Sequence, residues 1–137
     1  MTRKQEKYFP QTKDELRRLI KYRIEFEGNE VNLNDIDVSA ITDMSNLFAY
    51  NRDFNGDISS WDVSNVISMD SMFDRCESFN QDLSNWDVSN VTDMMYMFYN
   101  CKSFNQDLSS WNVSNVRYHL AIFYSCPIKD EYKPKFI

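Results

Sequence analysis

The sequence predicts an α/β solenoid, in which the chain winds into coils with a short parallel β-sheet on one face and short helical or 3₁₀ segments on the other. Three observations lead to this fold class. Residues 37–111 repeat every 25 residues without an insertion, and the same apolar residue types return at the same place in each repeat. Each repeat also holds both a strand-like and a helix-like apolar pattern.

The length of 137 residues suits one domain, and we expect a single domain over 1–137. Its expected parts are an N-terminal helical cap and first strand over 1–36, full repeats over 37–61, 62–86 and 87–111, and a partial repeat with a C-terminal cap over 112–137. Because one 25-residue unit cannot enclose a core, the repeats are expected to stack on one another.

The apolar positions form columns with one member in each repeat. Members of the main columns are Val38, Val63, Val88 and Val113; Phe48, Phe73, Phe98 and Phe123; Phe54, Phe79 and Phe104; and Trp61, Trp86 and Trp111. In stacked coils, matching side chains would lie about 4.8 Å apart and close a continuous core.

Two local patterns assign the faces of each coil. The spacing Leu83-x-x-Trp86-x-Val88 ends in the alternation of a short strand, and the same spacing at Leu33 predicts a first strand ahead of the first full repeat. The spacing Val91-x-x-Met94-x-x-Met97-Phe98 indicates a short helix or 3₁₀ turn.

Both ends of the array carry cap-like sequences. Thr12 and Glu15 form a capping box, and Gly28 suits a helix C-terminus, so we predict an amphipathic α-helix from about Lys13 to Glu27. Its expected apolar face is made of Leu16, Leu19, Ile20 and Ile24. At the other end Pro127 interrupts the last coil, and Ile128, Tyr132 and Phe136 are expected to fold over it.

The run Val-x-x-Met-x-x-Met-Phe-x-x-Cys-x-x-Phe-Asn-Gln-Asp-Leu-Ser-x-Trp-Asp-Val-Ser-Asn-Val resembles the repeat of the BspA-like bacterial surface proteins over residues 33 to about 126. The resemblance implies a right-handed, leucine-rich-repeat-like coil and a cell-surface or secreted setting linked to adhesion and protein binding. The first cysteine here is Cys76, so the N-terminal lipid-attachment cysteine of exported members has no counterpart.

The charge distribution argues against several classes of partner. Residues 37–111 carry twelve acidic side chains against Arg52, Arg75 and Lys102, within a net charge of −6. Such a surface repels phosphate backbones, so we expect no nucleic-acid partner. No apolar stretch is long enough to span a membrane, and the charged N-terminus shows no secretory signal, which favours a cytoplasmic location.

The cysteines and the single histidine are expected to be structural. Cys76, Cys101 and Cys126 share one column, which favours small buried side chains over a disulfide or a zinc site. His119 replaces a core methionine at the edge of the array. We expect no cofactor, no metal site and no enzyme, since phosphate-binding glycine loops and histidine-based catalytic motifs are missing.

Two aspartate columns frame the predicted strand, Asp57, Asp82 and Asp107 before it and Asp37, Asp62 and Asp87 within it. Because Trp86 and Val88 point inward, Asp87 should point outward. Three readings stay open: a solvated and hydrogen-bonded ladder, recognition of a basic partner, and binding of a divalent cation.

The asparagine columns Asn55, Asn80 and Asn105, and Asn65, Asn90 and Asn115, are expected to satisfy backbone groups in turns. The outer face then predicts a non-enzymatic protein-interaction module that binds a protein or peptide with a basic surface. Its candidate partner-binding residues are Ser60, Asp62, Asn85, Asp87, Ser110 and Asn112. The alternative is a structural or cell-surface display or adhesion protein with no small-molecule site.

Overall fold

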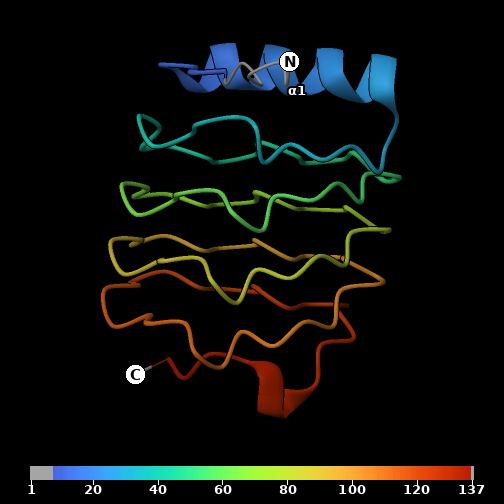
Figure 1. The fold of residues 1–137 in the computed structure, drawn as a ribbon. Coiled ribbons are helices and arrows are strands. Elements are labelled where there is room, and N and C mark those ends of the chain that lie inside the picture. The colour runs from blue at the N-terminus through green and yellow to red at the C-terminus, as the bar shows by residue number, and fades with distance from the viewer. Residues whose placement is uncertain (1–7, 137) are drawn as a thin grey trace.

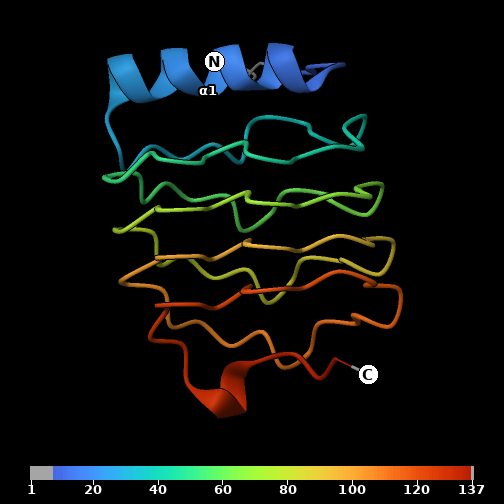
Figure 2. The ribbon, with the colours of Figure 1, turned by 180° about the vertical axis from the view of Figure 1, so that it is seen from behind.

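The computed structural model describes residues 8–136, and its elements are one α-helix and one 3₁₀ helix. Helix α1, Lys13–Glu27, lies across one end of a stack of irregular chain layers, and the 3₁₀ helix η1, Asp130–Tyr132, lies at the other end (Figure 1). The view from behind shows the same order, with each layer following the previous one down the stack (Figure 2).

The predicted helix is confirmed at both of its ends. The Thr12 hydroxyl oxygen accepts a hydrogen bond from the Glu15 N–H at 3.2 Å, and the Glu15 carboxylate in turn accepts from the Gln11 N–H at 2.8 Å. Gly28 ends the helix at φ 93°, a backbone conformation that favours glycine. Leu16 and Ile20 are fully buried against the first layer, so α1 does close that end of the core.

The predicted α/β solenoid, a leucine-rich-repeat-like coil with a parallel β-sheet on one face, is wrong. Residues 8–136 contain no named strand, and their β pairing is limited to isolated parallel bridges such as Asp43 with Ser68 and Ser68 with Asp93. The predicted strand Leu83-x-x-Trp86-x-Val88 is instead made of consecutive turns, in which the Trp86 N–H donates to the Leu83 carbonyl at 3.1 Å and the Val91 N–H to the Val88 carbonyl at 3.0 Å. An N–H used within its own turn cannot join a ladder, so the sheet does not form.

Side chains replace the missing ladder on the face that carries the tryptophans and the two aspartate columns, which we call the turn face. The indole N–H of each tryptophan donates to a backbone carbonyl of the layer before it, at 2.9 Å for Trp61 to Leu33 and 3.1 Å for Trp86 to Ile58. The Asn90 amide does the same to the Ser64 carbonyl at 2.7 Å. The predicted asparagine columns are therefore confirmed as partners for backbone groups.

The predicted helical or 3₁₀ face is also wrong. Residues 43–50, 68–75, 93–100 and 118–125, which we call the turn ribbons, form neither helix type. Each has positive φ at two positions four residues apart, which interrupts any helix: Asn46 and Tyr50, Ser71 and Arg75, Tyr96 and Asn100, and Ala121 and Ser125.

Backbone hydrogen bonds between layers are concentrated in these ribbons. At each junction four alternate N–H groups donate to four alternate carbonyls of the next layer, with N···O distances of 2.7–3.0 Å. In the middle junction the donors are Met69, Ser71, Phe73 and Arg75 and the acceptors are Asp93, Met95, Met97 and Tyr99. The face expected to be helical thus supplies the regular backbone pairing between repeats.

The predicted stacking of matching side chains is confirmed, but the ring centroids lie 5.4–6.5 Å apart, which is wider than the expected spacing of about 4.8 Å. The three tryptophans are 3–5% exposed, and their rings follow one another at 6.5 Å between centroids. Phe48, Phe73 and Phe98 stack at 5.4–5.5 Å in a second column. Matching side chains therefore meet across each layer although the backbone between them is neither sheet nor helix.

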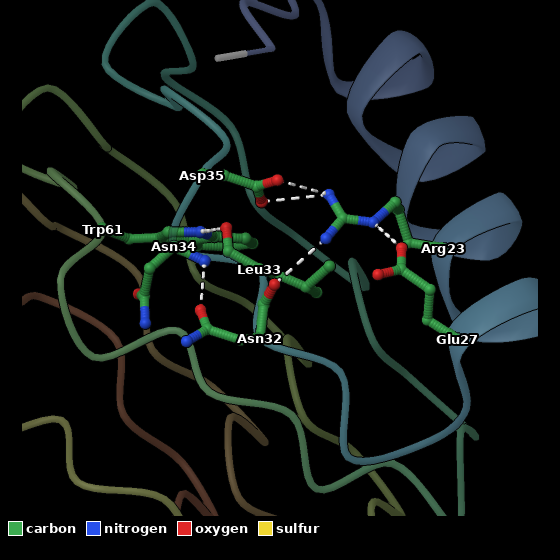
Figure 3. Close-up of polar contacts among 7 residues, drawn as sticks. All are labelled: Arg23, Glu27, Asn32, Leu33, Asn34, Asp35 and Trp61. Atoms are coloured by element: carbon green, nitrogen blue, oxygen red, sulfur yellow. Dashed lines mark hydrogen bonds and ion pairs between the residues drawn. The ribbon is translucent and has the colours of Figure 1, made fainter. Parts of the chain in front are cut away.

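A buried arginine joins α1 to the first layer (Figure 3). The Arg23 guanidinium donates to both Asp35 carboxylate oxygens at 2.9 and 3.0 Å, to the Asn32 carbonyl at 3.1 Å and to Glu27. Burial opposes its charge, but the hydrogen bonds that Arg23 donates to Glu27 and Asp35 outweigh that cost and raise the pKa of Arg23.

The predicted C-terminal cap forms in part. Ile128 is buried, the Tyr132 carbonyl accepts from the Leu108 N–H at 2.8 Å, and Phe136 stacks on His119 at 4.1 Å. This segment covers the core side of the last layer, and it makes no backbone hydrogen bond to residues 118–125 within the described part of the chain.

Candidate functional site

All six predicted partner-binding residues are exposed on the turn face. They come from equivalent places in successive repeats: Ser60 and Asp62, Asn85 and Asp87, and Ser110 and Asn112. The structure therefore places them in two rows, with one member of each row in each layer. Outward placement of Asp87 between buried Trp86 and Val88 is confirmed, although the reason is a turn rather than a strand.

The row made of Asp62, Asp87 and Asn112 stabilises its own turns. Asp62 Oδ1 accepts from the Ser64 N–H at 3.0 Å and from the Ser64 hydroxyl at 2.6 Å, and Asp87 does the same with Ser89. Asn112 takes this role in the next layer and accepts from the Ser114 N–H at 3.1 Å. This is the Asx-turn geometry, and it fixes the direction of each side chain.

The second aspartate column is built in the same way. Asp57, Asp82 and Asp107 each accept the N–H of the serine two residues on, at 2.9–3.0 Å. Hydrogen bonds from Ser89 lower the pKa of Asp87, and those from Ser109 lower the pKa of Asp107. These two carboxylates are therefore ionised at neutral pH, and the turn face carries fixed negative charge.

The cysteine column is buried at Cys76 and Cys101 and half-buried at Cys126. Cys76, Cys101 and Cys126 are free, and the thiols of Cys76 and Cys101 donate to the carbonyls of Phe48 and Phe73 at 3.0 and 2.9 Å. Burial raises the pKa of all three thiols, which favours the protonated form at neutral pH. Residues 8–136 hold no group of three or more His, Cys, Asp or Glu side chains placed to bind a metal ion.

An aromatic edge along the turn ribbons was not predicted from the sequence. The Arg75 guanidinium lies between the rings of Tyr50 and Tyr99, 5.7 and 5.5 Å from their centroids, and Tyr99 stacks on Tyr124 at 5.2 Å. These residues belong to two adjacent columns, and positive φ at Tyr50 and Arg75 turns the chain there. Columns of mixed residue type carry no apolar period, so sequence reasoning passed over them.

A groove of about 770 Å³ separates α1 from the first ribbon. Its walls include Arg17, Lys21 and Glu25 from the helix and Leu47 and Tyr50 from the ribbon. Helix α1 forms one wall of this groove and lies over the first layer.

No helix within residues 8–136 is long and apolar enough to cross a membrane. Residues 1–7, which the expectation about a secretory signal concerns, lie outside the described part of the chain.

Neither the curated proteins nor the solved structures compared with this chain gave a match. The profile of one family matches residues 15–133, a span that runs from the first turn of α1 through the four ribbons to the C-terminal segment. The chain therefore belongs to the family described as "Mycoplasma protein of unknown function, DUF285".

Proposed function

We propose that this chain is a non-enzymatic protein-interaction module that presents its acidic turn face to a basic protein or peptide. The observation that carries the proposal is the pair of aspartate columns, in which each carboxylate is held by a serine two residues on. The expected contact residues are Ser60, Asp62, Asn85, Asp87, Ser110 and Asn112.

Fixed carboxylates favour binding in two ways. Side chains already held by turn hydrogen bonds lose little rotamer freedom when a partner arrives, which lowers the entropic cost of association. A row of negative charge also attracts lysine and arginine side chains and speeds the encounter at low ionic strength. The same charge disfavours a nucleic-acid partner.

The likeness of the repeats to BspA-like surface proteins supports a setting at the cell surface, where protein binding would serve adhesion. It also favours the alternative, a structural or display protein whose acidic face has no specific partner. Cell fractionation distinguishes a protein at the cell surface, whether it binds a partner or serves display, from an interaction module in the cytoplasm. Recovery of the chain only in the cytosolic fraction would contradict display.

The acidic turn face can be tested with substitutions that already occur within the repeats. Asn112 supports the same turn as Asp62 and Asp87 without a charge, so the double variant D62N/D87N should remove charge and keep both turns. A matched control, D53N/E77Q, removes two charges outside the two aspartate columns.

The measurement is capture of partners from the native cell, with each captured protein identified by mass spectrometry at low and high salt. A protein retained by the parent and by D53N/E77Q, lost from D62N/D87N and released by salt is the expected result. If all three chains retain the same proteins, the turn face is not the binding surface.

A further inference from the structure

The last turn ribbon, residues 118–125, carries a row of backbone donors that are unpaired among residues 8–136. The N–H groups of His119, Ala121, Phe123 and Ser125 make no hydrogen bond to any described residue. Their intervening carbonyls, by contrast, all accept from the layer above; Tyr118, for example, accepts from Met94 at 2.8 Å. The ribbon is therefore paired on one side and open on the other.

The three other ribbons show what this row would bind. Their equivalent N–H groups all donate to alternate carbonyls of the following layer, as Met94, Tyr96, Phe98 and Asn100 do at 2.8–3.0 Å. These four donors point the same way along the stack, so the open side of the ribbon offers a row of N–H groups. The Arg117 carbonyl lies beside this row, in the column whose earlier members, Thr42, Ile67 and Thr92, accept from the following layer. The complement of the N–H row is a row of carbonyls spaced two residues apart.

Apolar side chains around this row lack their neighbours as well. Tyr118, Leu120 and Tyr124 are 57%, 64% and 60% exposed, whereas Asp93, Met95 and Tyr99, which stand in the same columns one layer earlier, are half-buried. Tyr99 has the ring of Tyr124 against one face, whereas no ring of a described residue stacks on the other face of Tyr124.

The C-terminal segment does not fill the gap. It reaches His119 through the ring of Phe136 and places the Lys133 Nζ 5.9 Å from the Phe123 ring centroid. Neither contact supplies a carbonyl to the donor row. The segment thus caps the core and leaves the ribbon edge available.

We propose that this edge, defined by the N–H row and by Tyr118, Leu120 and Tyr124, docks a repeat layer from another chain. The occupant is a turn ribbon of the same repeat type whose carbonyl side is uncovered. It would extend the stack by one layer through the pairing that already joins the repeats here.

A second intact copy does not fit this edge. Two copies related by a two-fold axis would oppose donor to donor. The carbonyls of Asp43, Ser45, Leu47 and Ala49 have no described donor and stand in the register of the missing layer. In an intact copy, however, α1 lies over that layer (Figure 1), and Lys13 is bonded to Asp43 and Ser45 at 3.1 and 2.9 Å.

The direct probe is a synthetic peptide of residues 37–61, which carries this carbonyl row without α1. Amide hydrogen exchange of the full chain is followed by NMR with and without the peptide. In the free chain the four end amides should exchange fast and those of Met94, Tyr96, Phe98 and Asn100 slowly. Added peptide should slow the four end amides by about tenfold or more, and a shuffled peptide should not.

Two variants then locate the contact. L120K/Y124K should weaken binding of the peptide by about tenfold. I67K/F26K, which alters exposed apolar side chains elsewhere, should leave peptide binding unchanged. Unchanged exchange at the end amides, equal protection by the shuffled peptide, or equal weakening by both variants would overturn the proposal. D62N/D87N should have no effect, so the outcome is independent of the acidic face.

Discussion

On the turn face, individual side chains connect each layer to the next. The indole N–H of Trp86 bonds the Ile58 carbonyl at 3.1 Å while its ring lies between those of Trp61 and Trp111. One residue therefore supplies both apolar burial and a hydrogen bond that a strand would have made with its backbone. Loss of such a side chain removes both contributions together.

Replacement of Trp86 by alanine should lower the free energy of unfolding by roughly 3–5 kcal/mol, the usual range for a large core aromatic. Urea denaturation followed by circular dichroism measures this change. Trp86→Phe keeps a buried ring and loses the indole donor, so its free energy of unfolding should lie between those of Trp86→Ala and the parent. An unchanged midpoint for the alanine variant would show that Trp86 does not hold the stack together.

Among the elements, α1 is attached by polar contacts as much as by apolar ones. Leu16 and Ile20 bury its apolar stripe, and Arg23 ties its last turns to Asp35 and the Asn32 carbonyl. Arg23 is only 6% exposed, so its charge is compensated by these partners and not by water. The helix is fixed over the first layer at this point and again where Lys13 meets Asp43.

Substitution of Arg23 by alanine should destabilise the protein by about 3 kcal/mol, the lower end for a broken buried pair because Asp35 keeps some solvent contact. Arg17→Ala and Arg18→Ala, at exposed positions of the same helix, should change stability by less than about 0.5 kcal/mol. Thermal melting of the three variants makes the comparison. Equal losses in all three would mean that the Arg23 cluster does not anchor α1.

At the scale of the whole molecule, each repeat contacts its neighbours through the same set of groups. The four-bond ribbon junction recurs at three places, and the tryptophan and asparagine links recur beside it. An array of this kind gains stability from nearest-neighbour contacts, so its length can change while its register is kept.

Deletion of residues 62–86, one complete repeat, should give a folded and less stable protein, because Asp87 then follows Trp61 in the register that Asp62 occupied. Deletion of residues 62–85 removes one residue less and should prevent native stacking after the cut. Tryptophan fluorescence and near-ultraviolet circular dichroism distinguish the two. Equal spectra and equal melting for both deletions would contradict a strict 25-residue register.

The amino-acid sequence alone determined the repeat length, the apolar columns, the outward aspartates, the backbone role of the asparagines and the limits of α1. Each of these depends on residue type and spacing, which stacking converts directly into contacts. Local patterns failed for the backbone: Leu83-x-x-Trp86-x-Val88 and Met94-x-x-Met97 fit strand and helix, yet both segments fold as turns. The choice depended on partners in the neighbouring layer, since an indole or amide that reaches a carbonyl frees the backbone N–H to close a turn. The open donor row had the same origin, because only the stacked structure shows which N–H groups find a carbonyl and which do not.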